Sequence, residues 1–152
     1  MHCKKCNANA VINMRHHKLA LCGEHYGEWF LGQTDRAIEK YKMFTRDERV
    51  LVAVSGGKDS LSLWDALLRL GYRADGLYIG LGINDPAPYS DVSLEKTRAF
   101  LASDVWRVSS DEENSASPVT RHTPLLHVVD IAQTYGKTIP QISREQMRGR
   151  GR

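Results

Sequence analysis

The chain has 152 residues, a net charge of +3 and 41% hydrophobic residues, enough for one modest core with a small appended module. It contains no run of 18 apolar residues and no secretory signal pattern, so we expect a cytoplasmic protein without membrane contact. All three cysteines lie in the first 22 residues, unlike a secreted disulfide framework. Residues 1–50 hold nine Lys and Arg against six Asp and Glu, which hints at a polyanionic partner.

The cysteines belong to two pairs of metal-ligand residues, Cys3-Lys-Lys-Cys6 and Cys22-Gly-Glu-His25. Two intervening residues suit a tight turn that aims both ligands at one ion, and four N/S ligands make a closed tetrahedral Zn²⁺ site. The alternative is a redox or structural CxxC with His25 on the surface. We interpret residues 1–26 as a module that is organised by structural zinc, because so few residues cannot build a core of their own.

A connecting helix is expected over residues 27–46. Apolar residues from Phe30 to Phe44 recur near helical spacing, with basic residues between them. The apolar stripe is typical of a helix that packs on a neighbouring domain, and a basic outer face is compatible with RNA contact.

Residues 50–60 read VLVAVSGGKDS, an apolar run that breaks at two glycines and enters a helical pattern. A strand that turns directly into a helix at glycines presents backbone N–H groups and a positive helix end to an anion. Hydroxyls and one lysine add donors, so we expect a phosphate site made of Ser55, Gly56, Gly57, Lys58, Asp59 and Ser60. A carboxylate beside phosphate is repulsive without a cation, which assigns Asp59 to Mg²⁺.

The Walker A loop does not fit this segment, because Asp59 follows Gly57-Lys58 and Val52 stands where its first glycine belongs. An ordinary Gly-Gly turn with a solvated lysine is the simpler alternative. The segment VAVSGGKDS resembles the SGGxDS signature of the PP-loop ATP pyrophosphatases. That resemblance implies cleavage of ATP between its α and β phosphates, with Lys58 and Asp59 as catalytic residues.

The fold class is predicted from the order of the elements that follow. A helical pattern after the loop ends at Gly71, apolar strands are expected at 74–82 and 125–130, and a helix at 90–102. Strands that alternate with helices indicate an α/β fold with a parallel Rossmann-like sheet, and the nucleotide lies over the carboxyl ends of the strands. We therefore expect the adenine near Ala53 and Ile79.

Residues 103–124 interrupt this pattern with a polar, Pro-containing stretch that we interpret as an exposed insertion. We assign no ligand role to His122 or His127. The nucleotide-binding domain is then expected over 47–152, incomplete and with this insertion.

The zinc pairs, SGGKDS, GLYIGLGI and LHVVD…YGKTIP together resemble the tRNA 2-thiolation group of PP-loop enzymes, over nearly the whole chain except 103–124. The resemblance implies adenylation of a uridine or 5-methyluridine O2 and its replacement by sulfur. It also implies ATP, Mg²⁺ and Zn²⁺ as cofactors, and tRNA with a sulfur-carrier protein or sulfide donor as partners. Whether the protein is a homodimer is left open by the sequence.

One departure from this family concerns sulfur chemistry. Family members place a catalytic CxxC after the segment that matches TIPQISRE, and a further cysteine completes an iron–sulfur cluster, whereas no cysteine follows Cys22 here. We therefore expect an N-terminal portion of a longer protein, with the cluster only in the full-length form and no sulfur transfer by this chain alone. The alternatives are another PP-loop adenylating ligase or amidating enzyme, and a zinc-dependent RNA-binding fragment.

Overall fold

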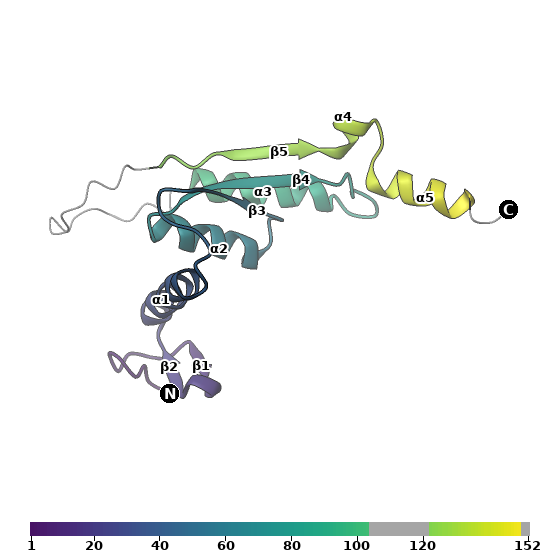
Figure 1. Ribbon diagram of the computed structural model, residues 1–152. Coiled ribbons are helices and arrows are strands. Elements are labelled where there is room, and N and C mark those ends of the chain that lie inside the picture. Colours follow the sequence, from purple (N-terminus) through teal and green to yellow (C-terminus); the bar gives the residue numbers. More distant parts are fainter. Residues whose placement is uncertain (104–121, 150–152) are drawn as a thin grey trace. The chain divides into compact units, whose positions relative to one another are not determined.

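The computed structural model describes residues 1–103 and 122–149. It contains two compact units, Met1–Thr45 and Arg46–Arg152, whose elements are labelled in Figure 1. No helix within the described ranges is both long and apolar enough to cross a membrane.

The first unit is a short antiparallel hairpin followed by a long helix. Its elements are β1 (Ile12–Met14), the 3₁₀ helix η1 (Arg15–His17), β2 (Leu19–Leu21) and α1 (Gly23–Tyr41). The connecting helix predicted over 27–46 is therefore shifted towards the N-terminus. The first turn of α1 carries few apolar residues, so the spacing of apolar residues does not predict it. The helix ends earlier than predicted because Lys42 adopts a left-handed conformation (φ 49°). The sequence does not predict β1 and β2, because strands of three residues are too short to show an alternating pattern.

The second unit is an α/β structure on a parallel sheet, which confirms the predicted fold class. Its elements are β3 (Arg49–Ala53), α2 (Lys58–Arg69), β4 (Arg73–Gly80), α3 (Tyr89–Ala102), β5 (Leu126–Asp130), α4 (Ile131–Tyr135) and α5 (Ile139–Gly149). The strands follow the order β3-β4-β5, and both pairs are parallel. Predicted strand and helix bounds differ from these by a few residues, but no element is predicted after residue 130. The predicted polar insertion lies, over 104–121, outside the described residues.

Trp64 of α2 fills the centre of the core. Its side chain is fully buried, its indole N–H donates to the Ala74 carbonyl at 3.0 Å, and its ring lies 5.3 Å from that of Phe100 on α3. A Cβ atom at Gly76 would lie 2.6 Å from the Trp64 ring. Glycine at this position of β4 therefore allows α2 and α3 to pack on one face of the sheet (Figure 1).

The other face of the sheet carries apolar side chains that the described residues leave exposed. Leu51 of β3 is 57% exposed, Ile79 of β4 46% and Val129 of β5 37%. Ala53 lies on this face as well, because it pairs with Leu77, which is two residues from Ile79. Parallel sheets are normally covered on both faces, so this sheet is covered on one face only within the described ranges.

Asp75 connects all three strands at the amino end of the sheet. Its carboxylate accepts hydrogen bonds from Arg49 at 2.8 Å, from His122 at 2.8 Å and from the Leu125 N–H at 2.9 Å. Burial raises the pKa of Asp75, but the hydrogen bonds from Arg49, Leu125 and His122 outweigh it and hold this pKa below its usual value. The charged carboxylate is thus the form that the folded protein stabilises.

We expect Asp75→Asn to lower the free energy of unfolding by about 3 kcal/mol at pH 7, because an amide cannot accept three donors, one of them cationic. Since the folded pKa lies below the usual 3.8, the contribution is complete above about pH 4 and is lost as pH falls through the folded pKa. Urea denaturation followed by tryptophan fluorescence at pH 7 and pH 3 measures this difference.

Asp47→Asn is the matched control, because Asp47 is an exposed carboxylate of the same unit. It should change the free energy of unfolding by no more than about 0.5 kcal/mol at either pH. An Asp75→Asn difference that is equal at pH 7 and pH 3 would contradict the role of the ionised carboxylate.

Candidate metal centre and phosphate-binding loop

The four predicted metal ligands come from three segments of the first unit. Cys3 and Cys6 lie on an N-terminal turn in which Asn7 adopts a left-handed conformation (φ 62°) and its N–H donates to the Cys3 carbonyl. Cys22 follows β2 directly and is the N-cap of α1, whose first turn carries His25. The hairpin and the helix start therefore bring the second pair to the first.

The ligand atoms of this cluster lie within 4.8 Å of one another. Cys6 Sγ is 3.7 Å from Cys22 Sγ, and His25 Nδ1 is 3.5 Å from Cys3 Sγ and 3.2 Å from Cys22 Sγ. Tetrahedral zinc with bonds of about 2.0–2.3 Å requires ligand separations of roughly 3.5–3.8 Å. A disulfide requires about 2.05 Å. The separations of 3.7 and 3.5 Å match the range for zinc, the 3.2 Å between His25 and Cys22 is shorter, and S₃N is a donor set that zinc takes.

The polypeptide around Cys3 favours a thiolate at that position. Burial raises the pKa of the Cys3 thiol, but hydrogen bonds from backbone groups of Cys22, Lys5 and Cys6 lower it to about 6. The Lys5 N–H lies 3.4 Å from the sulfur. The backbone hydrogen bond from Ala8 lowers the pKa of Cys6. Burial and the neighbouring sulfurs of Cys22 and Cys3 together outweigh it and raise this pKa above its usual value. Thiols this close to one another lose their protons most readily when they bind a cation.

The phosphate loop begins where β3 ends, at the carboxyl edge of the sheet. The Val54 N–H still donates to Leu77 at 2.8 Å, and the chain then bends at Gly56, whose φ is +71°. A Cβ atom at Gly56 would lie 2.3 Å from the Ser93 carbonyl oxygen of α3. Glycine is therefore required here twice, for the positive φ and for the close approach of α3.

Hydroxyl groups hold the loop in shape before α2 begins. Ser60 Oγ donates to the Gly57 carbonyl at 3.0 Å and accepts from the Ser55 N–H at 3.2 Å, and the two serine hydroxyls lie 3.3 Å apart. Gly57 is the N-cap of α2 without a side-chain hydrogen bond at the cap. The first amides of α2 are thus directed at the loop opening, where an anion is favoured.

Lys58 and Asp59 form an ion pair of 2.6 Å on the first turn of α2, with side chains 86% and 89% exposed. Both are therefore accessible to a ligand, and a metal–phosphate group could separate them at small cost because exposed ion pairs contribute little. Ala53 and Ile79 lie on the uncovered face of the sheet at its carboxyl end. The structure thus brings the six loop residues together and leaves the two predicted adenine neighbours accessible.

Sequence reasoning missed the residues that support the loop. Asn84 Oδ1 accepts from the Ser90 N–H at 3.1 Å at the start of α3, and Tyr78 donates to the Ser90 carbonyl at 2.6 Å. These contacts fix the helix whose Ser93 carbonyl meets Gly56. No motif signals them, because the groups in contact are mostly backbone atoms. His122, to which no role was assigned, binds Asp75.

Comparison with known proteins supports the predicted family. Residues 2–26 match the model of the 2-thiouridine synthetase TtuA N-terminal LIM domain. The Thermus thermophilus tRNA-5-methyluridine(54) 2-sulfurtransferase is 47% identical over 144 residues, which cover 95% of this chain and 38% of that protein. The protein of the same name from Thermotoga maritima is 39% identical over 112 residues, which cover 74% of this chain and 37% of that protein.

This chain matches the N-terminal portion of the PP-loop tRNA thiolases. The family prediction is confirmed, and the chain spans less than half the length of the relatives that it matches. Among solved structures, the U34-tRNA thiolase NcsA from Methanococcus maripaludis with its [4Fe-4S] cluster has a TM-score of 0.63 at 16% identity. The match covers 93% of this chain and 42% of that one, and it shows a common fold.

We expect Cys6→Ser to reduce bound zinc from about one ion per chain to a small fraction, because oxygen is a poorer zinc ligand in an S₃N site. Residues 1–30 should lose protection from hydrogen exchange, since the ion replaces a core there. Elemental analysis combined with hydrogen-exchange mass spectrometry measures both effects.

Chelation of the wild-type metal should reproduce the same pattern. Asn7→Gly, on the same turn but outside the cluster, should retain the zinc, because glycine tolerates the left-handed conformation of this position. Purified wild-type protein without zinc and with Cys3 joined to Cys6 would contradict this interpretation.

Proposed function

We propose that the protein acts in ATP-dependent 2-thiolation of tRNA, with residues 1–26 as a zinc module, 27–46 as a connecting segment that contains most of α1, and 47–152 as the nucleotide-binding domain. Cys3, Cys6, Cys22 and His25 would hold Zn²⁺, which supplies structural cross-linking to a hairpin and a helix start that have little core of their own. The observation that carries the proposal is the loop bent at Gly56, whose opening faces the first turn of α2.

This loop is suited to hold the phosphates of ATP. Ser55, Gly56, Gly57 and Ser60 would provide backbone and hydroxyl donors to the pyrophosphate end, and Lys58 would provide a charge. Asp59 would hold Mg²⁺, which neutralises phosphate charge when bound. Ala53 and Ile79 would contact the adenine, because both are accessible on the same face of neighbouring strands.

The reaction that fits such a site is adenylation. The O2 atom of the base attacks the α-phosphorus of ATP, the bond to the β-phosphate oxygen breaks, and pyrophosphate leaves. Lys58 and the loop donors stabilise the negative charge that grows on the leaving pyrophosphate. Sulfur from a sulfide donor or a sulfur-carrier protein then attacks C2, and AMP leaves with the former O2 oxygen.

The names of the relatives favour one acceptor. The two bacterial relatives at 47% and 39% identity are named for 5-methyluridine at tRNA position 54, so the proposed substrate is that nucleotide of tRNA in the cytoplasm. All three cysteines of this sequence belong to the metal cluster. The 152 residues would therefore bind zinc, ATP and tRNA without completing the sulfur step, which needs a thiol or a soft metal ligand.

We expect Lys58→Ala to weaken ATP binding by at most about 2 kcal/mol, because the backbone donors remain, whereas Asp59→Ala should chiefly remove the dependence on Mg²⁺. Isothermal titration of the zinc-loaded chain with ATP, with and without Mg²⁺, measures both. Lys96→Ala, an exposed lysine of α3, is the control and should bind ATP like wild type. Equal wild-type affinity with and without Mg²⁺ would refute the role of Asp59.

We also expect that this chain, given tRNA, ATP, Mg²⁺ and sulfide, forms no 2-thio nucleoside above a control without enzyme. A chain extended to the full length of the relatives and loaded with an iron–sulfur cluster should form it at position 54. Mass spectrometry of digested tRNA measures the product, with the Thermus thermophilus relative as positive control. An inactive extended chain beside an active control would point to a different acceptor.

A further inference from the structure

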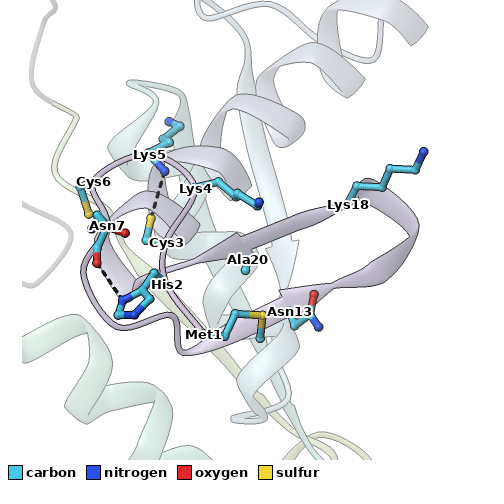
Figure 2. Close-up of a pocket in the computed structure, with 10 residues that line it drawn as sticks. All are labelled: Met1, His2, Cys3, Lys4, Lys5, Cys6, Asn7, Asn13, Lys18 and Ala20. Carbon is cyan, nitrogen blue, oxygen red and sulfur yellow. Dashed lines mark hydrogen bonds between the residues drawn. The ribbon is translucent and has the colours of Figure 1, made fainter.

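The zinc module contains an open hollow of about 800 Å³ beside the metal cluster (Figure 2). The N-terminal loop and the β1–β2 hairpin form it together. The Lys4 N–H donates to the Ala20 carbonyl at 2.9 Å, and Ala20 pairs with Asn13 across the hairpin. Lys4, Ala20 and Asn13 therefore form a row across three adjacent segments, with the small alanine between two polar side chains.

Two lysines on this hollow carry a charge that the described residues do not neutralise. Lys4 and Lys18 are exposed, and neither forms an ion pair within the described ranges. Lys5 differs, because its ammonium lies 2.9 Å from Glu28 and this contact lowers the pKa of the Glu28 carboxyl. Residues 1–23 contain four Lys and Arg and no Asp or Glu. The N-terminal turn and the hairpin therefore have no carboxylate that could neutralise the positive charge of the hollow.

Lys18 also has an unusual backbone. It follows η1 in a left-handed conformation with φ 51°, which costs a β-carbon residue roughly 1 kcal/mol and is easier for Gly or Asn. The hairpin therefore fixes the point from which the Lys18 side chain extends. Figure 2 shows Lys4 extending from the N-terminal loop and Lys18 from the end of the hairpin.

We propose that this hollow binds the phosphodiester backbone of RNA through Lys4 and Lys18, an inference that rests on the proposed function because that function supplies the RNA. Lysine ammonium groups act as point charges on phosphate and place no demand on base sequence. Asn13 adds an amide donor to phosphate or ribose oxygen. The hollow is open and wider than a single phosphate ion, so it suits a backbone that passes through it.

The test compares two double variants of the zinc-loaded 152-residue chain that remove the same charges. Lys4→Gln with Lys18→Asn removes the two positive charges that are proposed to bind phosphate in the hollow. Lys96→Gln with Arg98→Gln removes two exposed positive charges from α3 of the second unit. Lys18→Asn is compatible with the left-handed backbone at that position. Zinc content and circular dichroism confirm that both variants retain the wild-type fold.

Fluorescence anisotropy with a labelled tRNA transcript is measured at several salt concentrations. The hollow variant should bind roughly tenfold or more weakly at about 0.1 M salt, and the slope of log K against log salt should fall by about two, one per lysine. The control variant should bind like wild type. Equal losses in both variants, or no loss in the hollow variant, would overturn the proposal.

A competition experiment separates RNA from a small-anion site. Inorganic phosphate at constant ionic strength should leave tRNA binding unchanged, and full displacement by millimolar phosphate would overturn the assignment to RNA. If the hollow does not bind RNA, the proposed thiolation activity is unaffected, because the nucleoside assay with the extended chain tests that activity separately.

Discussion

The position of the phosphate loop depends on the close approach of Trp64 to Gly76. The indole occupies the space in which any larger residue of β4 would place its side chain, and its N–H is bound to Ala74. This fixes α2 against the sheet, and the same ring contacts Phe100 of α3. Because α2 and α3 are both held there, Gly56 meets the Ser93 carbonyl and the loop opens at the carboxyl edge of β3. Core packing thus sets the geometry of a site at the surface.

The first unit uses a different source of order. Cys3 is buried, but Cys6 is exposed, and the strands of the hairpin are only three residues long. Hydrophobic burial alone stabilises so small a unit poorly. An ion held by the four ligand atoms, which lie within 4.8 Å of one another, would cross-link the N-terminal turn, the hairpin and α1. Metal binding and folding of this unit would then be coupled.

The sequence predicts which residues lie together in the two candidate sites, because each is a local pattern. The CxxC and CxxH pairs and the SGGKDS loop lie within a few residues, and their neighbours along the chain determine their shape. The supports of these sites could not be predicted, since Ser93 acts through its carbonyl and Asp75 binds a histidine 47 residues away. The hairpin strands and α4 were missed because elements of three to five residues show no periodicity. The sequence of α5, IPQISREQMRG, is strongly polar and has too few apolar residues to define a helical spacing. The shift of α1 has another cause, because its first turn carries a metal-ligand residue and few apolar ones.

The hydrogen bonds that Asp75 accepts determine where the length of this domain can vary. His122 and the Leu125 N–H attach the start of β5 directly to β4, so the register of the third strand is set by residues that follow the connection from α3. The entropy of closing that connection rises only with the logarithm of its length. Insertions or deletions before His122 should therefore be tolerated without disturbing Ala53, Ile79 or the loop at Gly56. The length of this connection is thus free to differ among proteins that share the loop and the sheet.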